Sequence, residues 1–142
     1  MKYHYPFKRK YKLTSPYGSM IKRKKPHNGV DFATPIGTPL YPMSMGCVIG
    51  VGRNQLSGNF IRIEHADGLV TAYAHLSEVL VKVGECVDIN QVVAKSGITG
   101  HCRGAHLHLT VWTSRELLDT IDPMSIINAT IEISNKKTDL NG

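Results

Sequence analysis

The segment GAHLHLTVW, residues 104–112, places two histidines one residue apart in an apolar, β-branched run. In a β-strand, successive side chains alternate between the two faces of the sheet. We therefore expect Leu107 and Leu109 to face a core, and His106 and His108 to share the opposite face. Two imidazoles on one face can bind a metal ion or transfer protons.

A second candidate group is the segment PHNGVDF, in which three residues separate His27 from Asp31. The proline before the histidine and the glycine after it disfavour a helix, so a loop must direct both side chains inward. Zinc takes imidazole nitrogens and carboxylate oxygens in tetrahedral sites, and a catalytic site keeps the fourth position for water. We expect His27, Asp31 and either His106 or His108 to bind a single Zn²⁺ ion in this way.

His75 and the remaining histidine of the pair are then free for other chemistry. The pKa of an ordinary imidazole is about 6.5, so each ring can take up or release a proton near neutral pH. Hydrolysis needs such a group for the attacking water and for the leaving amine, together with a donor to the oxyanion. The HExxH motif of helical zinc proteases does not occur in the sequence.

Short apolar segments separated by turn residues must position these side chains. NFIRIEH and LVTAYAHLS, residues 59–65 and 69–77, flank an ADG turn and are typical of a β-hairpin. Strict alternation in the second segment would put His75 on the same face as Tyr73. Such strands along the chain predict an all-β fold, a compact antiparallel sheet or sandwich with the metal in a groove. The one short helix that we expect is SRELLDTID, residues 114–122.

Composition and charge limit the classes of protein to which the chain can belong. Hydrophobic residues make up 42% of its 142 residues, which is enough for the core of one domain. No apolar run reaches the roughly 20 residues of a transmembrane helix. Residues 1–26 carry nine of the 17 Lys and Arg and no acid, which suits an anionic cell-envelope polymer or plain solvation. We expect a basic N-terminal arm at 1–13, one domain at 14–134 and a polar tail at 135–142.

The three cysteines, Cys47, Cys86 and Cys102, form no CxxC motif. An odd number without that spacing argues against a disulfide framework, so we expect three reduced thiols. Cys102 and the neighbouring His101 are expected at the rim of the groove rather than among the metal ligands.

The order of these motifs resembles that of the lysostaphin-type (LytM-type) zinc metallopeptidases, endopeptidases that cut the peptide cross-links of bacterial peptidoglycan. The matching segments are HNGVDF, EHADGLVTAYAHLS, VGECVDINQVVAKSGITG and GAHLHLTV. The resemblance runs from about residue 14 to Pro123, which is most of the chain.

The resemblance implies a role for each of five side chains. His27, Asp31 and His108 would be the zinc ligands, with water in the fourth position. His75 and His106 would be the two catalytic histidines, and the sequence does not decide which of them is the general base.

The sequence departs from the family pattern beside the histidine pair. Ala105 stands where proline is common, and Leu109 and Thr110 stand where an aromatic residue and an acid are common. These differences remove no ligand, so we expect them to alter the shape of the groove. Tyr17 or Tyr73 could donate a hydrogen bond to the oxyanion.

Other interpretations explain less of the sequence. A catalytically inactive relative that binds the wall or regulates a wall hydrolase has no need of all five side chains. A biotinyl or lipoyl carrier module needs a lysine at a hairpin tip, which this sequence does not show. A nucleic-acid binder would be expected to carry a recognised motif, and the sequence contains none. The preferred interpretation is a zinc endopeptidase that acts on peptidoglycan. Because the N-terminus lacks the apolar stretch of a secretory signal, we expect synthesis in the cytoplasm and action on the wall, after holin release of a phage lysin or within a phage particle.

Overall fold

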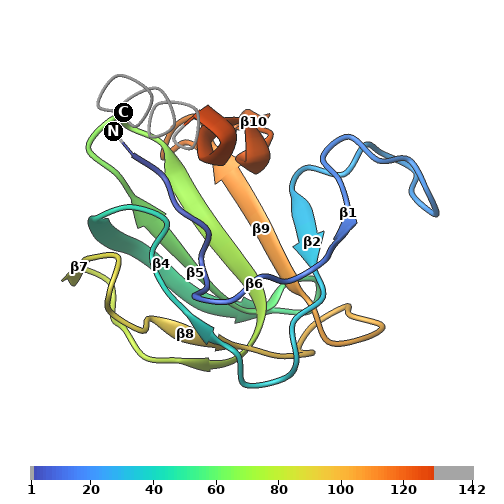
Figure 1. The fold of residues 1–142 in the computed structure, drawn as a ribbon, viewed down its shortest axis with the longest axis horizontal. Coiled ribbons are helices and arrows are strands. Elements are labelled where there is room, and N and C mark those ends of the chain that lie inside the picture. The colour runs from blue at the N-terminus through green and yellow to red at the C-terminus, as the bar shows by residue number, and fades with distance from the viewer. Residues whose placement is uncertain (1, 130–142) are drawn as a thin grey trace, which may run out of the picture.

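A computed structural model of the chain describes residues 2–129, which fold largely into antiparallel β-strands (Figure 1). The strands are β1 (Leu13–Ser15), β2 (Val30–Phe32), β3 (Pro39–Leu40), β4 (Gly46–Asn54), β5 (Gly58–Glu64), β6 (Val70–Val79), β7 (Cys86–Val87), β8 (Ala94–Ser96), β9 (Leu107–Trp112) and β10 (Thr120–Ile121). Seven of them follow one another across the sheet in the order β1-β2-β9-β6-β5-β4-β7. The expectation of an antiparallel all-β fold is confirmed.

Strand β6 is central to this arrangement because it pairs with three neighbours. Its first half lies between β5 and β9, and its last residues continue to β8. Tyr73 lies opposite Ile61 of β5 and Leu76 lies opposite Asn59, so β6 carries one more residue than β5 in this interval. An extra residue of this kind is a β-bulge, which redirects the side chains around it.

The core lies on one face of the sheet, as the alternation within β2 and β9 requires. Leu107 and Leu109 are 0% exposed, and they belong to the same apolar cluster as Val30 and Phe32. Each such side chain contributes about 1.5–3 kcal/mol through its burial. The opposite face of β2 and β9 is thereby left for Asp31 and the histidines.

The N-terminal segment crosses this core instead of extending from it (Figure 1). Tyr3 and Phe7 are buried, and the ring of Phe7 packs edge-on against Phe32 with centroids 5.1 Å apart. The Lys and Arg side chains of the segment are exposed. Residues 2–13, which belong to the basic arm expected at 1–13, are therefore tied to the domain by their aromatic residues. The expected tail at 135–142 lies outside the described residues.

The expected helix at 114–122 is wrong. Its first residues form turns, and Thr120 and Ile121 pair with β9 as strand β10. A helix instead occupies residues 123–129. Asp122 caps it by accepting a hydrogen bond from the Met124 amide at 2.9 Å, and a proline suits the first helical position. Within residues 2–129, no helix has the length and apolar character needed to cross a bilayer.

The expectation of three reduced thiols is also wrong. Cys47 of β4 and Cys86 of β7 lie directly opposite each other and form a disulfide. The partners are 39 residues apart in sequence, so only the pairing of their strands reveals the bond. Cys102 is a free cysteine.

Candidate metal centre

The two faces of β9 differ in the way that its sequence predicts. Leu107, Leu109 and Val111 are 0% exposed in the core. His106 and His108 lie on the other side, where they line an open groove with a volume of about 1000 Å³. The strand thus presents both imidazoles to solvent on a rigid support.

The sheet register brings Asp31 to the same place. Asp31 of β2 is the direct partner of His108 in β9, and Ala74 of β6 is the partner on the other side. Directly paired residues share a face of the sheet, so the carboxylate and the imidazole meet. His108 Nδ1 lies 2.9 Å from Asp31 Oδ1, and the small side chain of Ala74 leaves room for the ring.

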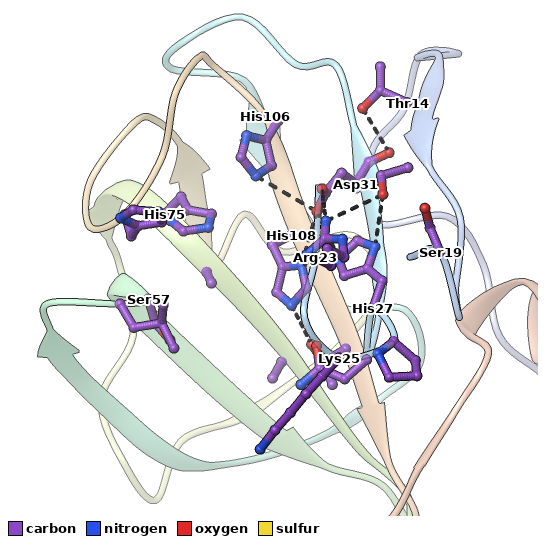
Figure 2. A pocket seen from close by; sticks show the side chains of 18 of the residues that line it. Thr14, Ser19, Arg23, Lys25, His27, Asp31, Ser57, His75, His106 and His108 are labelled. Carbon is purple, nitrogen blue, oxygen red and sulfur yellow. Dashed lines mark hydrogen bonds and ion pairs between the residues drawn. The ribbon is translucent and has the colours of Figure 1, made fainter. Parts of the chain in front are cut away.

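His27 reaches this pair from the loop before β2. Its Nε2 lies 3.1 Å from His108 Nδ1 and 3.4 Å from Asp31 Oδ1. Its Nδ1 faces away, toward Ser15 Oγ at 3.0 Å and the Pro16 carbonyl at 3.3 Å. Figure 2 shows the three side chains converging, and they form a group able to hold a metal ion.

The hydrogen bonds of these residues fit a divalent cation. The Pro16 carbonyl can only accept, so His27 carries its proton on Nδ1 and directs a lone pair at His108. His108 Nδ1–H then faces two acceptors, His27 Nε2 and Asp31 Oδ1. A cation can bind all three atoms once that proton moves to Nε2, where the hydroxyl of Thr110 lies 3.0 Å away.

Asp31 is kept ionised by the same neighbours. Burial raises the pKa of this carboxyl, but hydrogen bonds and charge from His108 and His27 outweigh burial and hold the pKa well below its usual range. Arg23 Nη2 lies 3.4 Å from Asp31 Oδ2. The carboxylate is therefore negative at neutral pH, as a metal ligand must be.

His75 enters the groove through the bulge of β6, which corrects the expectation that it shares a face with Tyr73. Its φ of 62° is in the left-handed region, which a residue other than glycine adopts only under constraint. Its amide donates to the Ser57 carbonyl at 2.7 Å. The break in alternation moves the ring to the side of Ala74 and His108.

The protonation of His75 is set by its surroundings. Its Nδ1 lies 2.7 Å from the Thr99 carbonyl, to which it donates, so Nε2 carries the lone pair. Burial lowers the pKa of His75, although the bond to Thr99 raises it in part. The ring is consequently neutral at pH 7 and can accept a proton on Nε2.

His106 lies across from His75, with ring centroids 4.8 Å apart. Its Nδ1 donates to the Gly104 carbonyl at 2.9 Å, and its Nε2 lies 3.7 Å from Asp31 Oδ1. Both rings therefore direct Nε2 toward the space beside the three candidate ligands. Figure 2 shows His75 and His106 on one side of His108, and His27 on the other.

The rim of the groove is basic. Residues 22–25, Arg62 and Arg103 line it, and Asp31 is the one acidic residue among the described lining. His101 lines the groove, as expected.

Neither tyrosine proposed for the oxyanion is free for that role. Tyr17 bonds to Thr120, whose carbonyl oxygen accepts at 3.0 Å, and Tyr73 donates to the Tyr41 carbonyl at 2.6 Å.

Three residues that contact the ligands were missed by the sequence reasoning. Thr110 lies two residues after His108 on the same face of β9, so the period of two could have revealed it. Ser15 and Arg23 reach His27 and Asp31 through loop geometry, for which no local pattern exists.

Known proteins resemble the chain in both sequence and structure. The model for peptidase family M23 matches residues 25–120. The chain is 39% identical over 140 residues to the peptidoglycan DD-endopeptidase ShyB of Vibrio cholerae, covering 94% of this chain and 33% of that protein. It spans about a third of the length of the curated relatives that it matches.

Two solved structures share the fold. A zinc-containing peptidase from Vibrio cholerae has a TM-score of 0.72 and 40% identity, covering 78% of this chain and 36% of that chain. The catalytic domain of the antimicrobial peptidase lysostaphin from Staphylococcus simulans has a TM-score of 0.76 and 34% identity, covering 83% of this chain and 92% of that domain. The family match spans more than half of the chain and includes all five side chains of the groove; the chain belongs to peptidase family M23.

Proposed function

We propose that the protein is a zinc-dependent endopeptidase that hydrolyses peptide cross-links of bacterial peptidoglycan. The observation that carries the proposal is the convergence of two separate sets in one groove. His27, Asp31 and His108 form a ligand group, and two further histidines direct Nε2 into the space beside it. The relatives named as peptidoglycan endopeptidases support this substrate class.

His27 Nε2, Asp31 Oδ1 and His108 Nδ1 would hold the zinc ion. When bound there, the ion supplies a Lewis acid that polarises the scissile carbonyl and lowers the pKa of a water. Ser15 and Thr110 fix the two ligand rings from behind, as outer partners do in zinc sites. The remaining chemistry is proton transfer, which the chain itself supplies.

His75 is assigned as the proton acceptor. Hydrolysis forms a bond between the water oxygen and the carbonyl carbon, and a proton of that water must leave as the bond forms. His75 has a free Nε2 lone pair and a pKa that burial lowers, so it is neutral and ready to accept. The C–N bond then breaks, and the leaving amine takes up a proton.

His106 is assigned as the donor to the developing oxyanion and the leaving amine. It is more exposed than His75, with 22% of its side chain accessible, so solvent can return a proton to it. In its charged form Nε2–H points into the groove, because Nδ1–H is held by the Gly104 carbonyl. Hydrogen-bond donors that are already in position before the reaction provide most of the stabilisation of a developing oxyanion.

The basic rim suits a substrate with free carboxylates. Residues 22–25, Arg62 and Arg103 all line the groove, so acidic peptide stems would meet positive charge there. The exposed basic side chains of the N-terminal segment lie outside the groove lining, and they support docking on an anionic cell-envelope polymer.

The test is digestion of purified peptidoglycan, with the fragments identified by mass spectrometry. We expect cross-linked fragments to be cut at a peptide bond, chelator to stop the reaction, and added Zn²⁺ to restore it. His106→Ala should lose about 100-fold or more in kcat, whereas His101→Ala, a nearby groove residue without a proton-transfer role, should stay within a few-fold of wild type. Equal loss in both variants, or no cut cross-link in any wall type, would refute the proposal.

The place of action is a further part of the proposal. The disulfide between Cys47 and Cys86 supports work outside the cytoplasm, because such bonds persist in oxidising surroundings. The finer proposal is a phage lysin or an enzyme carried in a phage particle. This finer proposal predicts that purified protein, added from outside, lyses cells whose envelope has been permeabilised. Cleavage of isolated cell wall without lysis of these cells would contradict it.

A further inference from the structure

The groove lining holds more arginine and lysine than its own acid can neutralise. Asp31 is the one acidic residue among the described lining, and Arg23 already lies 3.4 Å from it. Arg62 of β5 also lines the groove. Within the described part of the chain, its guanidinium contacts the ring of Phe60 and has no carboxylate partner.

The Arg62 side chain is held in place by its neighbours on the sheet. Its guanidinium carbon lies over the Phe60 ring, 4.5 Å from the ring centroid, and this stacking fixes the plane of the N–H donors. Phe60 in turn lies directly opposite Gly52 of β4. A side chain at Gly52 would come within 2.9 Å of the ring, so the glycine gives the ring its place. The guanidinium is thus oriented before any ligand arrives.

The nearest acid on this face of β5, Glu64, does not neutralise Arg62. Both of its carboxylate oxygens accept hydrogen bonds from Arg115, at 2.8 Å and 2.6 Å. The residues directly opposite Arg62 are Gly50 of β4 and Ala72 of β6, and neither has a polar side chain. The half-buried Arg62 therefore presents its charge to the groove.

The sheet register fixes how far Arg62 lies from the candidate metal centre. Ala72 is paired with Arg62 on one side and with Thr110 of β9 on the other, and Thr110 follows His108 on the same face. Neighbouring strands are about 4.8 Å apart, so Arg62 lies roughly 10 Å from β9. An extended peptide rises about 3.3 Å per residue. A peptide that crosses the strands, with its scissile bond at the metal centre, would bring its second or third residue from that bond to Arg62.

We propose that Arg62 is a specificity-determining residue that binds a free carboxylate of the stem peptide, two or three residues from the scissile bond. The protein would then select stems with free carboxylates over stems in which these groups are amides. A planar guanidinium matches a carboxylate with two parallel hydrogen bonds, whereas a carboxamide has a single oxygen and no charge. This inference rests on the proposed function and names the substrate class of the same groove.

The experiment uses one cross-linked stem-peptide dimer in two forms, with its side carboxyl groups free or converted to amides. The kcat/KM for each form is measured with the zinc-loaded wild type, Arg62→Gln and Arg53→Gln. The ratio of the two values is internal to each variant, so differences in folded fraction or zinc content cancel. Arg53 is the matched control, an exposed arginine of β4 that does not line the groove. Calorimetric binding of the two uncross-linked stem peptides measures the same preference without cleavage.

We expect wild type and Arg53→Gln to prefer the free-carboxylate form about tenfold in both assays, because hydrogen bonds between charged groups are the stronger kind. Arg62→Gln should bring both ratios close to one. Equal ratios in wild type and Arg62→Gln would overturn the inference, as would the absence of any preference in wild type. A binding preference that depends on Arg62, in a protein that cuts neither form, would uphold carboxylate recognition and refute the proposed function.

Discussion

Replacing Thr110 with valine tests how the sheet prepares His108 to bind a metal ion. Thr110 is 4% exposed, and its Oγ1 lies 3.0 Å from His108 Nε2. The metal-free protein can keep the His108 proton on Nδ1, beside Asp31. When Nδ1 binds the ion, the proton must move to Nε2, where valine would leave it without its acceptor in the protein.

The substitution should therefore weaken metal binding more than it lowers the stability of the metal-free protein. In a side chain that is 20% exposed, a donor without its acceptor costs at most about 1–3 kcal/mol, and about 1.4 kcal/mol corresponds to a tenfold change in a dissociation constant. We expect Thr110→Val to weaken zinc binding about 10- to 100-fold, which is the usual effect of losing an outer partner. The free energy of unfolding of the metal-free protein should fall by only about 1 kcal/mol. Competition with a chelator of known affinity measures the first quantity, and urea denaturation measures the second.

The chain offers a matched control in Thr71, another buried threonine that is paired with a histidine. Thr71 Oγ1 lies 2.9 Å from His65 Nε2, and the Met45 carbonyl holds His65 Nδ1 at 2.9 Å. Thr71→Val should lower the free energy of unfolding by about 1 kcal/mol and leave zinc affinity unchanged. If both variants weakened zinc binding equally, the reasoning about the His108 proton would be refuted.

Three other predictions follow from burial and cross-linking. Because burial lowers the pKa of His75 below the ordinary 6.5, its neutral form persists into mild acid, and the acid limb of kcat/KM should have its midpoint below pH 6.5; a midpoint above that value would contradict its role. Replacing Cys47 and Cys86 together with alanine should lower the free energy of unfolding by about 2–4 kcal/mol, given a loop of 39 residues, and an unchanged urea midpoint would contradict the bond. Phe7→Ala should cost about 3–5 kcal/mol because the ring is buried against Phe32, whereas a free arm would lose nothing measurable by denaturation.

The sequence predicts most of the candidate metal centre because two local rules combine there. The period of two in β9 places His106 and His108 on one face, and the same period in β2 separates Asp31 from Val30 and Phe32. Residue types then limit the chemistry, since imidazoles and a carboxylate suit zinc.

The parts that the sequence does not predict depend on contacts between separate segments of the chain. The bulge that turns His75 into the groove depends on Ser57 and on the loop that carries Thr99. The disulfide depends on the pairing of β4 with β7. Residues 114–122 have a helical pattern, but pairing with β9 gives their last residues a strand. In each case a contact with another segment of the chain decides the outcome, and local periodicity contains no signal for it.

The central claim is that three of the five side chains bind the metal and that two perform proton transfer. The most direct measurement is zinc bound per chain after dialysis against metal-free buffer, compared between His108→Ala and His75→Ala. We predict about one ion per chain for wild type and His75→Ala, and nearly none for His108→Ala. Retention of zinc by His108→Ala, or its loss from His75→Ala, would contradict the account.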